Sequence, residues 1–308
     1  MEESATNPSC RSLLQPGTLW LETTKRTKTA RESGALKSIE TEYHLIEQQD
    51  ICFVVRTLSN LARKEAARKQ QSQQEQKTNK RIDPFLPYEP DLFVGDISDT
   101  HICLLNKFNV VDNHLLIVTR AFEEQTDLLN IEDFKALWSC MQEMPGLAFF
   151  NGGKTAGASQ RHKHLQLIPL PFLPNVIYYP LDKAIAKVVF VDSLGKIDCF
   201  PFVHAIATLD LTNHSLETAA NILLQRYHEL LDRVGFKCDR HEPKQPGAYN
   251  LIATKNWMLI VPRSQESFQN ISINSLGFAG SLFVRDRNQL ELLKELTPLK
   301  LLTEVAFS

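Results

Sequence analysis

The sequence lacks the features that mark disulfide-stapled, zinc-binding or membrane-spanning proteins. Its six cysteines form no Cys-x-x-Cys pair, and no zinc-ligand spacing can be assembled from them and the nine histidines. No stretch approaches the roughly 20 apolar residues that a membrane helix needs, and the polar start, MEESATNPSC, contains no apolar signal region. We therefore expect a soluble, cytoplasmic protein with reduced thiols, no protein-held metal ion and no membrane partner.

An excess of charge of either sign is also missing. The 34 Lys and Arg residues nearly balance the 36 Asp and Glu residues, which leaves a net charge of -2. Such a chain has no general positive field to gather a polyanion, so we do not expect nucleic acid as a partner, and any recognition of phosphate must be local. With 43% hydrophobic and 23% charged residues, the composition is that of an ordinary globular protein.

Short apolar runs alternate with amphipathic segments along the chain. Residues 101–106 and 114–119 read HICLLN and HLLIVT around an Asp-Asn turn, which predicts a hairpin of buried strands. Residues 249–264 predict a second hairpin around a Lys-Asn turn. The spacing of apolar residues predicts helices over residues 131–144 and 215–234. Together these segments predict an α+β fold.

Other segments carry weaker patterns. Residues 36–45 have strand-like alternation, and the apolar positions from Val54 onward fall at helical spacing. Residues 64–82 are basic and rich in Gln, so they cannot bury an apolar face and are expected to form a flexible connector. We divide the chain into an N-terminal domain, residues 1–210, which contains this connector, and a C-terminal region, residues 211–308.

The segment between Phe150 and Pro169 contains a glycine-rich turn between two expected strands. Small residues let backbone N–H groups approach an anion closely, which is how many phosphate-binding turns are built. By themselves these residues would indicate only an ordinary loop. The small residues are Gly152, Gly153, Ala156, Gly157 and Ala158.

Two histidines and a glutamine follow this turn at alternate positions. On a strand, alternate residues share a face, so His162, His164 and Gln166 line one side. An imidazole, with an ordinary pKa of about 6.5, is a competent nucleophile at neutral pH and can carry a nucleotidyl group. The alternatives are a hydrogen-bonded pair of histidines or two metal ligands, although no third ligand stands in the motif.

The segment Gly157–Gln166, GASQRHKHLQ, resembles the G-x-S-x-x-H-x-H-x-Q signature of the transferase branch of the histidine-triad superfamily. Flanking segments, among them LLNKFNVVDNHLLIVTRAFEEQ and SINSLGFAGSLFV, are similar to those of the diadenosine tetraphosphate phosphorylase (ATP adenylyltransferase) family. The resemblance covers most of the chain from about Ser33 onward. Arg161, where many relatives carry proline, and the long connector depart from the family pattern.

The resemblance implies an antiparallel histidine-triad sheet with packed helices and a C-terminal extension that completes the cleft. It implies that His164 is the covalent nucleophile, that His162 orients it, and that Gln166 donates a hydrogen bond to the transferred phosphate. His114 is expected near the same pocket. Along the bound substrate it places Lys64, Asn106, Lys107, Asn151, Gly157, Ala158, Ser159, Gln160, Ser272, Ile273, Asn274, Ser281 and Arg285.

Structural roles compete with these assignments at several positions. Asn106 is also suited to a turn, and His114 to a hydrogen-bonded place in the core. Arg285 could equally be a solvated charge, and Asn274 with the glycines after it could form a tight strand turn. For these residues both interpretations stay open.

The implied reaction is a double displacement at the α-phosphorus of diadenosine tetraphosphate, with inorganic phosphate as the acceptor and ATP and ADP as products. A divalent cation such as Mg²⁺ is expected to arrive with the polyphosphate, and Lys107 and Arg285 are candidates for holding the acceptor phosphate. The alternatives are a hydrolase, a sugar-nucleotide uridylyltransferase and a nucleotide-binding regulator without turnover. The absence of zinc-type cysteine spacing disfavours the uridylyltransferase.

Overall fold

The structure is a computed structural model of the 308-residue chain. The predicted connector over residues 64–82, and Lys64 within it, lie outside the residues that the structure describes. The described parts are residues 13–58, 83–171, 173, 178–237 and 242–308.

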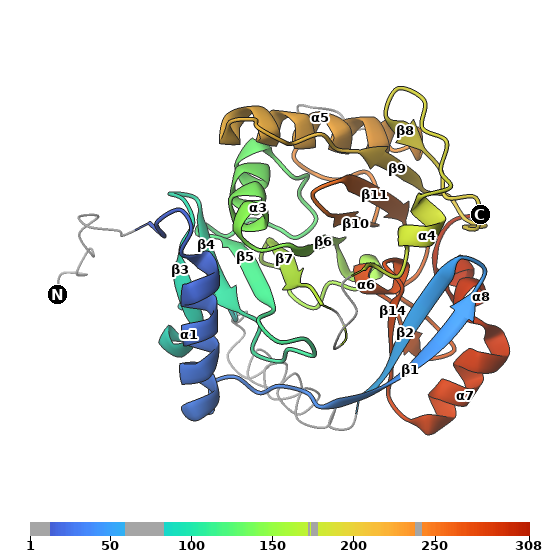
Figure 1. Ribbon diagram of the computed structural model, residues 1–308, viewed down its shortest axis with the longest axis horizontal. Helices are drawn as coiled ribbons and strands as arrows, with labels where there is room; N and C mark the ends of the chain where they lie inside the picture. The colour runs from blue at the N-terminus through green and yellow to red at the C-terminus, as the bar shows by residue number, and fades with distance from the viewer. Residues whose placement is uncertain (1–12, 59–82, 172, 174–177, 238–241) are drawn as a thin grey trace.

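A large sheet runs through the centre of the molecule, and every pair of neighbouring strands in it is antiparallel (Figure 1). This confirms the α+β prediction and both predicted hairpins. The sheet includes strands from both sides of residue 210, and the domain boundary proposed there stays a prediction. In spatial order the strands are β3 (Phe93–Asp96), β4 (His101–Leu105), β5 (Leu115–Thr119), β7 (His164–Pro169), β6 (Gly146–Gly152), β10 (Tyr249–Ala253), β11 (Trp257–Pro262), β9 (Ala205–Thr208) and β8 (Leu194–Gly195).

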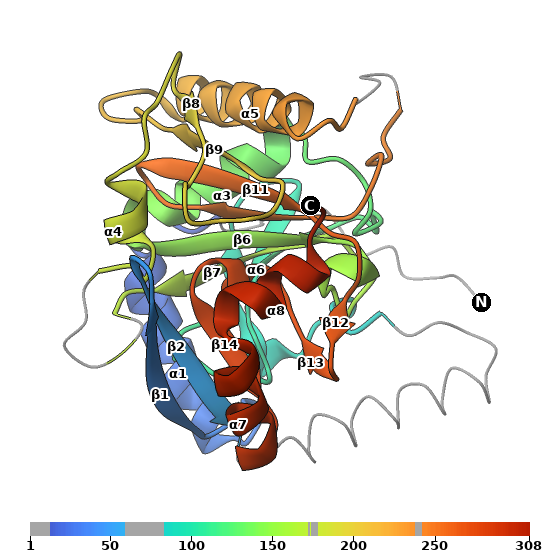
Figure 2. The same ribbon diagram turned by 90° about the vertical axis from the view of Figure 1, so that its right-hand side faces the viewer.

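Two long helices cover one face of this sheet, α3 (Ile131–Glu143) and α5 (Leu216–Arg233) (Figure 2). Asn130 begins α3 with a capping box, in which its side chain accepts from the Asp133 N–H and the Asp133 carboxylate accepts from the Asn130 N–H. The Ser215 hydroxyl accepts from the Thr218 N–H at the start of α5. Both helices lie where the apolar spacing predicted them.

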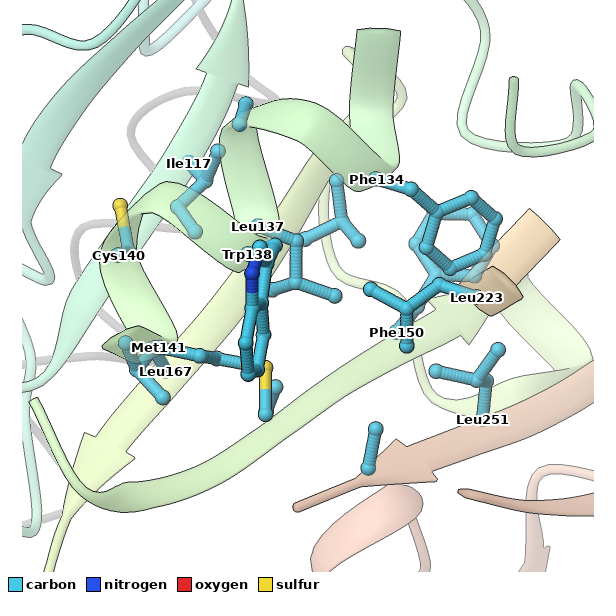
Figure 3. Close-up of a cluster of buried hydrophobic side chains, with 14 of the residues drawn as sticks. Ile117, Phe134, Leu137, Trp138, Cys140, Met141, Phe150, Leu167, Leu223 and Leu251 are labelled. Carbon is cyan, nitrogen blue, oxygen red and sulfur yellow. The ribbon is translucent and has the colours of Figure 1, made fainter. Parts of the chain in front are cut away.

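The core between these helices and the sheet is made of large apolar side chains (Figure 3). Phe150 and Leu167 from the sheet meet Phe134, Leu137 and Trp138 of α3. Each fully buried side chain of this size contributes roughly 1.5–3 kcal/mol to folding. This layer gives β6 and β7 a rigid backing, and the histidines lie on the opposite face of β7.

The C-terminal part of the chain packs against the other face of the main sheet (Figure 2). A second sheet of three strands lies there, in which β2 is the central strand. A second core of buried apolar residues joins these elements to the main sheet. The elements are β1 (Thr41–Gln48), β2 (Ile51–Leu58), α4 (Asp182–Ile185), β12 (Ser267–Phe268), β13 (Ile271–Ser272), α6 (Ser275–Phe278), β14 (Ser281–Val284), α7 (Arg287–Leu296) and α8 (Pro298–Val305).

The helix predicted from Val54 is wrong for the residues that the structure describes, because residues 51–58 form strand β2. This strand pairs with β1 on one side and with β14 on the other, and residues 53–56 are all buried. A strand covered on both faces carries a continuous apolar run, which does not show the alternation of a half-exposed strand. The strand predicted at residues 36–45 begins later, at Thr41.

Among the described helices, the longer helices α1 and α8 and the single-turn helices α4 and α6 were not predicted. The first, α1 (Leu19–Glu32), lies beside β3 and the short 3-10 helix η1 (Pro90–Leu92). The second, α8, follows α7, which corresponds to the segment RDRNQLELLKEL, residues 285–296, that the apolar spacing predicts as the final helix.

Candidate active site

Strand β7 places the motif side chains as the two-residue period predicts. Leu165 and Leu167 belong to the core beneath α3 and α5, so His164 and Gln166 face the other side of the sheet. His162 lies just before β7 and forms an isolated bridge with Glu124. All three motif side chains are buried or nearly so.

The His164 ring is held in one tautomer. Its Nδ1 lies 2.8 Å from the carbonyl oxygen of His162, and because a carbonyl only accepts, Nδ1 carries the hydrogen. The Nε2 atom therefore keeps a lone pair, and it has no hydrogen-bond partner among the described residues. Burial is the main cause that lowers the pKa of His164 to about 4; the hydrogen bond to the His162 carbonyl opposes this shift, and the charge of His162 adds to it. The ring is therefore neutral at physiological pH.

His162 anchors the strand from which His164 projects. Its Nε2 lies 2.8 Å from the carbonyl oxygen of Thr119 and 2.9 Å from the Thr119 hydroxyl. Its Nδ1 lies 2.7 Å from the Asp83 carboxylate. The ring of Phe85 packs edge-on against His164, at 5.0 Å between ring centroids. The carbonyl that fixes the His164 tautomer thus belongs to a residue whose own ring is held at both nitrogens.

The Gln166 amide is oriented by a chain of side chains. Asn106 accepts from the Phe108 N–H with Oδ1, so its Nδ2 donates to His114 Nδ1 at 3.3 Å. His114 Nε2 must then carry a hydrogen, and it donates to Gln166 Oε1 at 3.0 Å. This leaves the Gln166 amino group as the donor that faces the site. The structure therefore brings Asn106, His114 and Gln166 together as the sequence predicted.

The glycine-rich turn contacts the C-terminal part of the chain. Gly157 has φ +90°, and a Cβ atom placed on it would lie 2.8 Å from the Asn274 Cβ and 2.8 Å from the Ile273 carbonyl oxygen. Only glycine allows this close approach. The turn contains a short 3-10 helix, η2 (Lys154–Ala156). The close approach at Gly157 brings this turn against residues 273–274.

The backbone donors of this turn divide into two groups. The N–H groups of Gly157 and Ala158 bind the carbonyl oxygens of Lys154 and Gly153, at 2.9 Å and 3.1 Å. The N–H groups of Ser159 and Gln160 have no hydrogen-bond partner in the described parts of the chain. The donors that are available to an anion are therefore those of residues 159–160, which stand immediately before the histidines.

Asn151 is the centre of a buried polar network. Its Oδ1 accepts from Asn250 Nδ2 at 2.9 Å and from the Ser275 N–H and hydroxyl at 2.9 Å and 2.8 Å. Arg263 donates to Asn250 Oδ1 at 2.6 Å and to the Ile273 carbonyl oxygen at 2.9 Å. Burial lowers the pKa of Arg263 to about 10. The network fixes α6 against β6 and β10.

The predicted C-terminal residues take different places. Asn274 is the N-cap of α6 and accepts from the Leu276 N–H at 3.0 Å, while Ile273 is buried in the core. Ser272 is exposed at the end of β13. Ser281 begins β14 and pairs with Val54.

The remaining predicted residues are held elsewhere. Lys107 forms an ion pair with Glu89, and Arg285 is exposed, with its N–H donating to Gln289. Within the described residues no hydrogen bond or ion pair joins Lys107, Ser281 or Arg285 to the motif side chains, so their substrate contacts stay predictions.

Sequence reasoning missed several residues that hold the histidines: Asp83, Phe85, Thr119 and Gln125. None stands in the motif, and they reach it only through the fold.

A buried ion network also lies behind the motif, where Lys163 Nζ is 2.7 Å from Asp133 and 2.9 Å from Glu123. Burial lowers the pKa of Lys163, but Asp133 and Glu123 raise it more, so the amine stays charged.

Among the residues that the structure describes, no helix is both long and apolar enough to pass through a membrane. In the same parts of the chain, no group of three or more His, Cys, Asp or Glu side chains is placed to hold a metal ion.

Comparison with known proteins finds two family models that match successive parts of the chain. Residues 9–187 match the Ap4A phosphorylase N-terminal domain, and residues 198–308 match the ATP adenylyltransferase C-terminal domain. Diadenosine 5',5'''-P1,P4-tetraphosphate phosphorylase 2 of Saccharomyces cerevisiae is 31% identical over 241 residues, which are 70% of this chain and 73% of the yeast protein.

Solved structures of a yeast protein have the same fold. The crystal structure of yeast Ap4A phosphorylase Apa2 has a TM-score of 0.75 at 25% identity, covering 94% of each chain. Its complex with AMP has a TM-score of 0.73 at 26% identity, covering 96% of this chain and 98% of the yeast chain.

Proposed function

This chain belongs to the Ap4A phosphorylase family, and from that premise we propose that it cleaves diadenosine tetraphosphate (Ap4A) with inorganic phosphate, giving ATP and ADP. The resemblance carried by residues 157–166 is thereby confirmed. The yeast relative is named for this reaction, and the yeast structure with AMP supports a nucleotide as the ligand here.

The observation that carries the proposal is the state of His164. Its Nδ1 hydrogen is bound to the His162 carbonyl oxygen, its pKa is lowered to about 4, and its Nε2 lone pair has no partner in the described residues. A nucleophilic histidine needs this combination, because a protonated ring or a ring with the other tautomer has no lone pair at Nε2.

In the first step, Nε2 attacks the α-phosphorus of Ap4A and a P–N bond forms. The bond from that phosphorus to the bridging oxygen breaks, and ATP leaves with the electron pair. Charge that accumulates on the equatorial oxygens would be stabilised by the Gln166 amino group and by the N–H groups of Ser159 and Gln160. The His162 carbonyl accepts the Nδ1 hydrogen of the imidazolium-like ring that results.

In the second step, an oxygen of inorganic phosphate attacks the same phosphorus. The P–N bond breaks, ADP leaves, and His164 returns to its neutral form. Lys107 and Arg285 are the positively charged side chains that the sequence suggested for holding the acceptor phosphate, and we keep both as proposals. Neither has a hydrogen bond to the histidines in the described residues.

A divalent cation such as Mg²⁺ is proposed to come with the polyphosphate. Asp83 is the carboxylate in contact with the His162 ring, and both of its oxygens are in use, one with His162 at 2.7 Å and one with the Phe85 N–H at 2.9 Å. A cation bound at the site would therefore draw its ligands from phosphate oxygens and water, which Mg²⁺ accepts readily, and it would neutralise charge on the departing polyphosphate. We propose the cytoplasm as the compartment, consistent with the free cysteines Cys52, Cys103, Cys140 and Cys199.

The test is to incubate the protein with Ap4A and Mg²⁺, with and without inorganic phosphate, and to separate the products by ion-exchange chromatography. With phosphate we expect ATP and ADP over many turnovers. Without phosphate we expect the nucleotidyl-protein adduct and one equivalent of ATP per adduct, with no ADP. His164→Ala should give neither. ATP and AMP without phosphate would instead identify a hydrolase, and no turnover would favour a nucleotide-binding regulator.

A further inference from the structure

We propose that Gln125 is a positioning residue for His164, and this inference rests on the proposed nucleotidyl transfer. Its carboxamide lies between β6 and β7 at the level of the nucleophile and binds the main chain of His164 on both its N–H and its carbonyl. Gln125 stands outside the histidine motif, and only 2% of it is exposed.

The pairing of β6 with β7 stops just before the nucleophile. The two strands pair from Gly146 and Pro169 to Phe149 and Gln166. Continuing this register by two residues would pair Asn151 with His164, so that their N–H and carbonyl groups would bind each other. That pair does not form.

The Gln125 amide takes the place of the missing pair. Its Oε1 accepts from the His164 N–H at 2.8 Å, and its Nε2 donates to the His164 carbonyl at 3.2 Å and to the Asn151 carbonyl at 3.0 Å. A side-chain amide offers the same donor and acceptor as a peptide group, so it satisfies both strands while holding them apart. The strands are thereby separated at the point where the imidazole leaves β7.

The segment that carries Gln125 is itself fixed to the histidine motif. The Lys163 N–H donates to the Glu123 carbonyl at 2.8 Å, and the Gln125 N–H donates to the Arg161 carbonyl at 2.6 Å. Glu124 forms an ion pair with Arg161. Residues 123–125 therefore act as a short partner for the chain between the glycine-rich turn and β7.

The consequence for catalysis is a nucleophile with little freedom. Gln125 fixes the main chain of His164, and the His162 carbonyl fixes its ring. In-line attack requires the reacting atoms to be aligned to within a fraction of an ångström, and a misplacement of about 1 Å can cost on the order of 100-fold in rate. Loss of the carboxamide should therefore slow the transfer step more than it weakens nucleotide binding.

At position 125 the side chain must accept one hydrogen bond, from the His164 N–H, and donate two, to the carbonyl oxygens of His164 and Asn151. An amide can do both, whereas an ionised carboxylate can only accept. In Gln125→Glu, an ionised side chain would face the carbonyl oxygens of His164 and Asn151 without a hydrogen. Protonation would restore one donor. Because His164 itself stays neutral down to about pH 4, a gain of activity on acidification would report the residue at position 125.

The experiment compares Gln125→Leu and Gln125→Glu with the parent protein and with Gln48→Leu. The amide of Gln48 also accepts from a backbone N–H and donates to an oxygen, on Leu299 and Thr297, but it has no contact with the histidines. We would measure kcat, KM, the single-turnover rate of the nucleotidyl adduct without phosphate, and thermal unfolding. His164 would also be titrated by NMR of the ring nitrogens, which needs no substrate.

We expect Gln125→Leu to lower kcat and the single-turnover rate by roughly 10- to 100-fold with KM changed by less than about threefold, and to shift the NMR signals of the His164 ring nitrogens. Gln48→Leu should keep the parent kcat. Gln125→Glu should gain activity as the pH falls from about 8 to 6, and this variant carries the test if Gln125→Leu does not fold.

The inference is overturned if Gln125→Leu keeps the parent rate, or if Gln48→Leu loses as much. It is also overturned if the His164 ring signals and titration in Gln125→Leu match the parent, whatever the activity. Failure of the parent protein to cleave Ap4A would count against the proposed function alone, because the NMR comparison would still decide the role of Gln125.

Discussion

Two histidines in this chain share one backbone arrangement, and only one is placed to react. His164 and His204 are both buried, at 5% and 3% exposure, and each stands at or just before the start of a strand in the main sheet. In each, Nδ1 donates at 2.8 Å to the carbonyl oxygen two residues earlier. Burial lowers the pKa of both rings. Burial, tautomer and lowered pKa therefore do not by themselves make a nucleophile.

The difference lies at Nε2 and in the flanking residues. His204 Nε2 accepts from the Ile197 N–H at 2.8 Å, so its lone pair is in use, whereas His164 Nε2 has no partner in the described residues. His204 stands between Phe202 and Ile206, where His164 stands between His162 and Gln166. The rings of Phe200 and Phe202 also pack against His204. His204 is therefore a hydrogen-bonded residue of the apolar core, whereas His164 stands between polar residues and keeps a free lone pair at Nε2 in the described part of the chain.

The largest expected effect separates the two histidines by matched substitutions. His164→Gln should lower kcat/KM for Ap4A by at least about 10³-fold and abolish the nucleotidyl adduct, because no other group offers the attacking nitrogen. His204→Gln should keep the rate within about threefold and lower the free energy of unfolding by about 1–3 kcal/mol, because it disturbs a buried hydrogen-bonded group. Steady-state kinetics and denaturant unfolding of both variants check this.

If His204→Gln lost as much rate as His164→Gln, and circular dichroism showed both variants to be folded, His204 would not be a purely structural residue. Retention of the adduct in His164→Gln would assign the nucleophile to another residue.

The next effect concerns the residue two positions after each histidine. Gln166→Ile gives the reactive histidine the flank that His204 has in Ile206. We expect kcat to fall by about 10²- to 10³-fold, the usual cost of removing one donor to developing charge, while the His164 tautomer and adduct chemistry persist. Rapid-quench measurement of adduct formation checks the prediction, with the volume-conserving Ile206→Leu as control. A change of less than about threefold would show that Gln166 is not a donor to the transition state.

The same comparison shows what could be predicted from the sequence. The sequence predicted that His162, His164 and Gln166 lie together, because alternate residues of a strand share a face and these three lie within five positions. The structure forms strand β7 over residues 164–169, as this prediction requires. A Phe-x-His-x-Ile pattern around His204 carries no such polar face. The helix over residues 215–234 was equally predictable, because its N-cap and apolar spacing are local signals.

Other features depend on contacts between distant parts of the chain. Asp83 meets His162 across 79 residues of sequence, and Gln125 meets His164 across 39. No periodicity encodes such contacts. Helix α1 escaped prediction because it buries Thr23 and Thr27 while Trp20 and Leu21 are exposed, at 44% and 52%, so its apolar residues do not mark its buried face. Strand β2 was not predicted because residues 53–56 are all buried, so its sequence does not alternate between apolar and polar residues.

A third prediction uses the lowered pKa of His164. In the unfolded chain the ring binds a proton below about pH 6.5, whereas in the folded protein it does so only below about pH 4. Its contribution to stability is therefore present above pH 6.5 and is lost as the pH falls to about 4, which amounts to about 3 kcal/mol over this window.

The measurement is the free energy of unfolding in urea at several pH values between about 4 and 7. The parent protein should lose about 3 kcal/mol more than His164→Gln over this range, because glutamine does not titrate. His204→Gln should also flatten the profile in the same direction. Parallel profiles for the parent and His164→Gln would mean that the folded and unfolded pKa values of His164 are alike.

The smallest effect concerns the residue two positions before each histidine. His162→Phe gives the reactive histidine the flank that His204 has in Phe202. The main-chain carbonyl that fixes the His164 tautomer remains, while the ring contacts with Thr119 and Asp83 are lost. We expect kcat to fall by about tenfold, which corresponds to one hydrogen bond of about 1.4 kcal/mol that keeps the strand in place, with the adduct still formed. A loss as large as that of His164→Gln would show that the His162 ring takes part in the transfer itself, and the reactive site would then differ from the core site at two rings instead of one.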